Sequence, residues 1–381
     1  MANGAESIGL EAPSWTTQAQ AGSGTRFDWT MIALCGWFLG GLYLDGWAHN
    51  HLDTLDSFFT PWHGAFYSGF GAVASLTIGA LLRNHARGDP WRRGLPPGYE
   101  LSLVGVLIFV VSGVGDMIWH LTFGIEVRME ALLSPTHLGL TMGVALLVSG
   151  PFRAAWRRAN DAGLPTWTSQ GPMVVSLALL LSVFTFWTMF THPLSRPWAA
   201  VGNRPTAPIF PLVAPNPDLV THDGGIFGID IGQSLGIDDI LLQTALLMAL
   251  VLLLVRRWGW RVPHGSLTLV FTLNACLMGF MRDQQVLIPA ATIAGIGADG
   301  LLHQLKPSAA RPVAVRLFAC GVPVIFYSVY FLTLKLIQGI WWSVHLWAGA
   351  IVLAGIVGWL ISYLIMAPPV PQAEEGISLT P

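Results

Sequence analysis

The chain repeats an arrangement of aspartate and histidine that is suited to binding metal ions. One copy reads Asp45-Gly-Trp-Ala-His49 and the other reads Asp116-Met-Ile-Trp-His120. Residues four apart lie on one face of a helix, with about 5–6 Å between their Cβ atoms. Each copy is therefore expected to present a carboxylate and an imidazole together.

A second element follows each copy after a short polar segment. It consists of a hydroxyl residue, a proline and, two residues after the proline, a histidine. Proline is favoured in the first turn of a helix, and serine or threonine just before it is favoured as the N-cap. The histidine is therefore predicted to lie in the first turn of the returning helix, level with the aspartate and histidine of the outgoing one. The residues are Thr60, Pro61 and His63 in the first copy and Ser134, Pro135 and His137 in the second.

One carboxylate and two imidazoles form the ligand set of non-haem iron sites with open positions, and imidazole also suits copper and zinc. Each helical hairpin is predicted to hold such a set. The two sets could bind separate metal ions, or one dinuclear centre if the hairpins adjoin. The alternative for a single copy is an aspartate–histidine pair that tethers a loop. The predicted metal ligands are Asp45, His49, His63, Asp116, His120 and His137.

The spacing of Asp45, His49 and His63 resembles a metal motif in the membrane subunit of copper-dependent methane and ammonia monooxygenases. The resemblance covers this motif alone, and the corresponding interval in the second copy is longer. It favours copper among the candidate metals. A pair of histidines with this separation also occurs in helices that stack two haems. Asp53, Asp56 and Pro61 interrupt the interval here, which excludes one continuous helix.

The composition places these motifs in a membrane. Of the 381 residues, 10% are charged and 53% are hydrophobic, whereas soluble proteins carry roughly 25% charged residues. A formal net charge of -2 gives no basic face for a nucleic-acid partner. A helix needs about 20 mostly apolar residues to cross the hydrocarbon core.

The predicted fold is an all-α polytopic membrane protein, a bundle of about ten transmembrane helices built from antiparallel hairpins. Residues 1–27 are expected to form a disordered tail, 28–366 the transmembrane domain and 367–381 a second disordered tail. The apolar segments lie near 29–48, 62–82, 101–121, 137–152, 172–192, 236–255, 265–281, 286–304, 313–336 and 342–366.

Basic residues predict the orientation, because loops on the cytoplasmic side carry an excess of lysine and arginine. They gather in alternate connections, which predicts that both termini are cytoplasmic and that the metal site lies near the outer face of an inner or cell membrane. The connections on the basic side contain Arg83, Arg87, Arg92, Arg93, Arg153, Arg157, Arg158, Arg256, Arg257, Arg261, Lys306 and Arg311.

Three further histidines are candidates to complete the site from the outer side. His192 ends the fifth apolar segment, His222 lies in a long outer connection at 193–235, and His345 begins the last segment. The long connection could form a lid over the site or an unstructured loop. Gly36 and Gly40 in the first span and Gly69 and Gly71 in the second would allow close helix contact, although ordinary membrane packing accounts for them as well. Only the first pair has the spacing that puts both glycines on one helix face.

These features predict a metal-dependent membrane oxidoreductase, similar to a monooxygenase, that acts on a small or lipophilic substrate. Copper or iron is favoured as the cofactor, and zinc would also fit. The expected partners are the lipid bilayer and, for the electrons, a donor or partner subunit; nucleic acid is excluded. The alternatives are a zinc-dependent membrane lipid hydrolase and a non-enzymatic metal-binding or haem-binding subunit or transporter.

Overall fold

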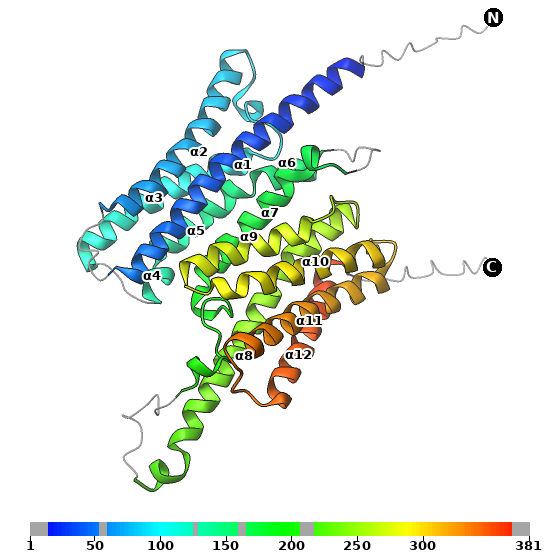
Figure 1. The fold of residues 1–381 in the computed structure, drawn as a ribbon. Coiled ribbons are helices and arrows are strands. Elements are labelled where there is room, and N and C mark those ends of the chain that lie inside the picture. The colour runs from blue at the N-terminus through cyan, green and yellow to red at the C-terminus, as the bar shows by residue number, and fades with distance from the viewer. Residues whose placement is uncertain (1–13, 53–58, 125–128, 159–164, 206–216, 368–381) are drawn as a thin grey trace, which may run out of the picture.

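The computed structural model describes residues 14–52, 59–124, 129–158, 165–205 and 217–367, with side chains omitted for 14–23 and 217–229. This part of the chain is helical and contains no sheet (Figure 1). The helices are α1 (Ser14–His51), α2 (Pro61–Ala86), α3 (Glu100–Phe123), α4 (Glu130–Leu133), α5 (Pro135–Val148), α6 (Gly150–Arg157), α7 (Trp167–Trp187), α8 (Pro217–Trp258), α9 (Ser266–Met281), α10 (Ile288–Leu305), α11 (Pro312–Ile337) and α12 (Val344–Ile365).

The helices identify an integral membrane protein. In the described part of the chain, 8 helices are long and apolar enough to span a bilayer, or up to 9 when α5 and α6 count as one bent span. The expected number was ten. The remaining apolar segment is α9, whose 16 residues rise about 24 Å at 1.5 Å per residue, less than the roughly 30 Å of hydrocarbon.

The fourth expected span, 137–152, is broken rather than straight. Helices α5 and α6 meet at Ser149 with a bend of 43°. Pro151 stands in the first turn of α6, and it has no N–H with which to continue the hydrogen-bond ladder of α5. The second helix therefore starts anew at Gly150.

Two expected irregular segments are helical instead. Helix α1 begins at Ser14, inside the predicted tail 1–27, and α8 begins at Pro217, inside the predicted loop 193–235. Glycines within 217–235 favour a loop, because glycine lowers helix propensity by about 1 kcal/mol per residue. The helix extends through them, and its first part projects beyond the other helices (Figure 1). The expected tails at 1–13 and 368–381 lie outside the described residues.

Basic side chains gather at one end of the bundle. Arg158 pairs with Asp28 near the start of the apolar part of α1, and Arg257 donates to the Arg158 carbonyl. Arg316 of α11 donates to a backbone carbonyl just after α12. Asp45 lies 17 residues beyond Asp28 in the same helix, about 25 Å away along its axis. The aspartate–histidine motifs therefore occupy the opposite end of the bundle.

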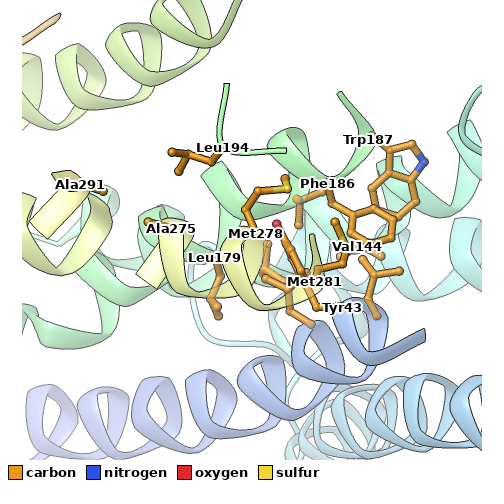
Figure 2. Close-up of a cluster of buried hydrophobic side chains, with 14 of the residues drawn as sticks. Tyr43, Val144, Leu179, Phe186, Trp187, Leu194, Ala275, Met278, Met281 and Ala291 are labelled. Carbon is orange, nitrogen blue, oxygen red and sulfur yellow. The ribbon is translucent and has the colours of Figure 1, made fainter. Parts of the chain in front are cut away.

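A buried apolar cluster joins α1 to α7 and α9. Figure 2 shows Tyr43 of α1 near Phe186 of α7 and Met278 and Met281 of α9. The rings of Tyr43 and Phe186 are 5.2 Å apart in an edge-to-face arrangement, and the Tyr43 hydroxyl donates to the carbonyl of Ser182. These contacts hold the end of α1 that carries Asp45 against α7 and α9.

The α1–α2 hairpin packs through Gly41 and Gly69, of which the sequence indicated only Gly69. A Cβ atom on Gly69 would lie 2.5 Å from the Cα atom of Phe38, and one on Gly41 would lie 2.8 Å from the Cα atom of Phe66. Gly36 and Gly40 have open space at their Cβ positions. The close approach of the helices, which sets the spacing between the ligand-bearing faces, therefore depends on Gly41 and Gly69.

Candidate metal centre

The first group gathers Asp45, His49 and His63 at the junction of α1 and α2. Their potential ligand atoms all lie within 4.8 Å of one another. The Asp45 carboxylate oxygen Oδ2 is 3.8 Å from His49 Nε2 and 3.4 Å from His63 Nε2. The helical spacing of Asp45 and His49 and the short return to α2 thus bring the three side chains to one point.

The second group repeats this geometry with Asp116, His120 and His137 from α3 and α5. Asp116 Oδ2 is 3.4 Å from His120 Nε2, and Asp116 Oδ1 is 3.4 Å from His137 Nε2. The group is more enclosed than the first. The side chain of His120 is 10% exposed, whereas that of His49 is 36% exposed.

The distances within both groups suit ligands of a shared ion. Hydrogen bonds of this kind span 2.7–3.2 Å, and all four aspartate–histidine separations exceed that range. Two atoms that each lie about 2.0–2.1 Å from a tetrahedral ion are about 3.4 Å apart. Each group could therefore hold one metal ion with three protein atoms and leave a coordination position open.

The predicted N-caps also orient the histidines of the returning helices. The Thr60 and Ser134 hydroxyls accept the backbone N–H of His63 and His137 at 3.1 and 3.4 Å. The same hydroxyls contact the Nδ1 atoms of these rings at 3.2 and 2.6 Å. A partner on one ring nitrogen fixes the ring so that the other nitrogen can face a metal. In both copies the other ring nitrogen, Nε2, faces the aspartate.

His120 is oriented by a backbone carbonyl. Its Nδ1 atom lies 3.3 Å from the carbonyl oxygen of Gly124, which follows α3. A carbonyl oxygen can only accept a hydrogen bond, so this contact favours a ring hydrogen on Nδ1. A ring with its hydrogen on Nδ1 alone would present the lone pair of Nε2 toward Asp116, as metal coordination requires.

The two groups adjoin one another. Asp45 lies within electrostatic range of Asp116, and His49 lies within range of His120 and His137. Placing two neighbouring carboxylates in a membrane protein costs free energy unless cations or hydrogen bonds compensate their charge. Metal ions in both groups would supply that compensation.

One difference separates the two copies. The Thr136 hydroxyl donates to Asp116 Oδ1 at 2.9 Å, while Trp62 occupies the corresponding position of the first copy. Asp45 Oδ1 is buried and has no hydrogen-bond partner among the described residues. Burial of a carboxylate oxygen without a hydrogen-bond partner is costly. This oxygen therefore favours a bound cation at the first group.

The end of α1 is tied to the turn between α9 and α10. Arg282 donates to the side chains of Asn50 and Ser195, and His51 contacts Asp283 at 2.6 Å. Burial lowers the pKa of Arg282 below its ordinary value. The turn holds the last residues of α1, and with them His49, in place.

The additional histidines lie outside both groups. His192 is buried, and its Nδ1 atom accepts the Leu194 N–H at 3.0 Å; burial lowers its pKa to about 3. His345 is exposed at the start of α12. The side chain of His222 lies outside the described residues. The groups of potential metal ligands found among the described side chains contain none of the three.

Two residues near the groups were not predicted. Thr136 lies between Pro135 and His137 of the second copy, and its hydroxyl donates to Asp116. Tyr67 of α2 lies within electrostatic range of both Asp45 and Asp116. It stands four residues after His63, on the same helix face, which is the signal that could have identified it.

No family model, curated protein or solved structure matches the chain.

Proposed function

We propose that the protein is a metal-dependent membrane oxidoreductase of the oxygenase type, with its metal centre formed by the two adjoining groups. The observation that carries this proposal is the 3.4–3.8 Å spacing of carboxylate and imidazole atoms in both groups. Iron or copper suits two imidazoles and one carboxylate. The basic residues at the opposite end of the bundle favour a position of the centre near the outer face.

In this proposal the residues have distinct roles. Asp45, His49 and His63 would hold one ion, and Asp116, His120 and His137 would hold the second. A redox-active ion with an open coordination position would supply activation of dioxygen. In the net reaction one oxygen atom would be inserted into a C–H bond of the substrate, and the other would be released as water after uptake of two electrons and two protons from an external reductant.

A cavity beside the centre favours an enzyme over a metal-storage protein. It measures about 680 Å³, and His63 and Tyr67 form part of its wall. Ligand pockets commonly measure 300–1,000 Å³. A molecule in this cavity would lie next to a group that could bind metal.

The test combines metal analysis with matched histidine variants. Elemental analysis of detergent-purified protein should find iron or copper in each of the two groups. His120→Ala should lose the ion of the second group, and His345→Ala, a change of an exposed histidine outside both groups, should retain both. Zinc in both groups without redox-active metal would contradict the oxidoreductase proposal, as would equal metal content in the two variants.

Activity provides a second readout. Protein in vesicles, supplied with an artificial reductant, should consume dioxygen when an apolar hydrocarbon is present, and His120→Ala should abolish this consumption. Hydrocarbon-dependent dioxygen uptake that survives in His120→Ala would refute the proposed role of the second group.

A further inference from the structure

The cavity beside the candidate metal centre lies between two membrane-spanning helices. Helix α2 contributes His63, Gly64 and Tyr67 to its wall, and α3 contributes Val110 and Val114, among other residues. Both helices meet the length and hydropathy of membrane spans, and most of their residues are not buried within the protein. The cavity therefore borders the lipid region of the bundle.

The wall of the cavity is almost entirely apolar. Phe70, Phe109, Val110, Val114 and Met117 form much of it, and it contains no acidic or basic side chain other than His63. A charged ligand would find no counter-ion there, and moving it out of water would be costly. An uncharged apolar molecule loses no hydrogen bonds on entering.

The cavity opens toward lipid along α3, and it also reaches Phe59 and Thr60 just before α2. Val110 is 45% exposed and Val114 is 52% exposed. Val111, which does not line the cavity, is 64% exposed on the same helix. Exposed valines in the middle of a spanning helix contact acyl chains, so a molecule dissolved in the bilayer can reach this opening directly.

Polar groups occur at the inner wall of the cavity. His63 belongs to the first group, and Tyr67 lies within electrostatic range of both aspartates. The Tyr67 hydroxyl lies close to Gly113, where a Cβ atom would be 3.6 Å from it. Because Gly113 and Gly64 have no side chain, the space in front of these polar groups stays open.

We infer that this cavity is the substrate site and that the substrate is an uncharged, predominantly apolar molecule of medium size, which enters from the bilayer between α2 and α3. The inference rests on the proposed function and deepens it by naming the substrate class and its route. The cavity volume of about 680 Å³ lies in the range of pockets for drug-sized ligands. It is much larger than the volume that a dioxygen molecule alone would occupy.

Photolabelling tests the inference without requiring turnover. The full chain in phospholipid vesicles is exposed to an octyl diazirine, irradiated and digested, and the labelled peptides are identified by mass spectrometry. Label at Val110, Val114 and Met117, which line the cavity, should be displaced by excess n-octane but not by octanoate. Label at the lipid-facing Val111 should resist displacement. Label that n-octane does not displace anywhere would show a groove filled by ordinary lipid chains and would overturn the inference.

Two matched pairs of variants locate the site. Gly64→Leu fills the cavity and Gly79→Leu does not, although both glycines have open space in α2. Val110→Trp and Val111→Trp form the corresponding pair in α3. The amount of displaceable label should fall on the order of tenfold in Gly64→Leu and Val110→Trp, which corresponds to a loss of about 1.4 kcal/mol of binding free energy. It should remain unchanged in the two control variants. Equal labelling within both pairs would overturn the inference.

Metal analysis of the same samples separates the two proposals. Bound metal without displaceable label would reject the apolar substrate site and leave the metal centre intact. Displaceable label in protein that binds no iron or copper would reject the proposed oxidoreductase and retain the cavity as a binding site for apolar molecules.

Discussion

Thr136 offers a direct test of how the second group is held. Its hydroxyl donates to Asp116 Oδ1 at 2.9 Å, and Asp116 is 2% exposed. Thr136→Val keeps the shape of the side chain and removes this hydrogen bond, together with the 3.2 Å contact between the Thr136 and Ser134 hydroxyls. A hydrogen bond to a charged group contributes about 1.5–3 kcal/mol, and each 1.4 kcal/mol corresponds to tenfold in affinity. Loss of an outer partner of a metal ligand commonly weakens binding about 10- to 100-fold.

The measurement isolates the second group by working in an Asp45→Ala background, in which the first group lacks its carboxylate. Competition with a chromogenic chelator should show the Kd for copper or iron rising about 10- to 100-fold in Thr136→Val. Thr141→Val is the control, because the Thr141 hydroxyl donates only to a carbonyl of its own helix. An unchanged Kd in Thr136→Val, or an equal rise in Thr141→Val, would refute the reasoning.

Three other outcomes follow from the packing and from burial. Gly69→Ala should destabilise the protein by about 1–3 kcal/mol through overlap with Phe38, whereas Gly36→Ala should not destabilise it; thermal unfolding compares the two. Removal of metal by a chelator should lower the unfolding free energy by about 2.7 kcal/mol relative to free metal at 100 times its Kd, and a variant without both group aspartates should show no such change. His192, whose folded pKa of about 3 lies below the ordinary 6.5, binds its proton more readily when unfolded. Stability should therefore be fully present above pH 6.5 and fall by up to about 1.4 kcal/mol per pH unit toward pH 3. His192→Asn, which keeps an acceptor for the Leu194 N–H, should flatten that dependence in melting curves.

The local geometry of each group follows from short-range rules. Four-residue spacing puts Asp45 beside His49, and the hydroxyl–proline pair places His63 in the first turn of α2. The N-cap prediction is confirmed at both Thr60 and Ser134. These features depend on residues a few positions apart, and backbone geometry determines their placement.

The long-range features were not predictable in this way. Whether Asp45 and Asp116 adjoin depends on how two hairpins pack, and no periodicity within either hairpin specifies that contact. The role of Gly41 rather than Gly40 reflects which face of α1 turns toward α2. The sequence between Pro217 and Gly236 shows turn-forming glycines, yet it continues the helix of the following span.

The six aspartates and histidines of the two groups all precede α6, and the described helices after it contribute no member to either group. The rest of the chain reaches the centre through α7 and α9, which pack against the end of α1 that carries Asp45, and through the turn at Arg282 and Asp283, which binds the last residues of α1. Exchanges of one apolar residue for another should therefore be tolerated along the lipid-facing sides of α10, α11 and α12, provided that these contacts with α1 are kept.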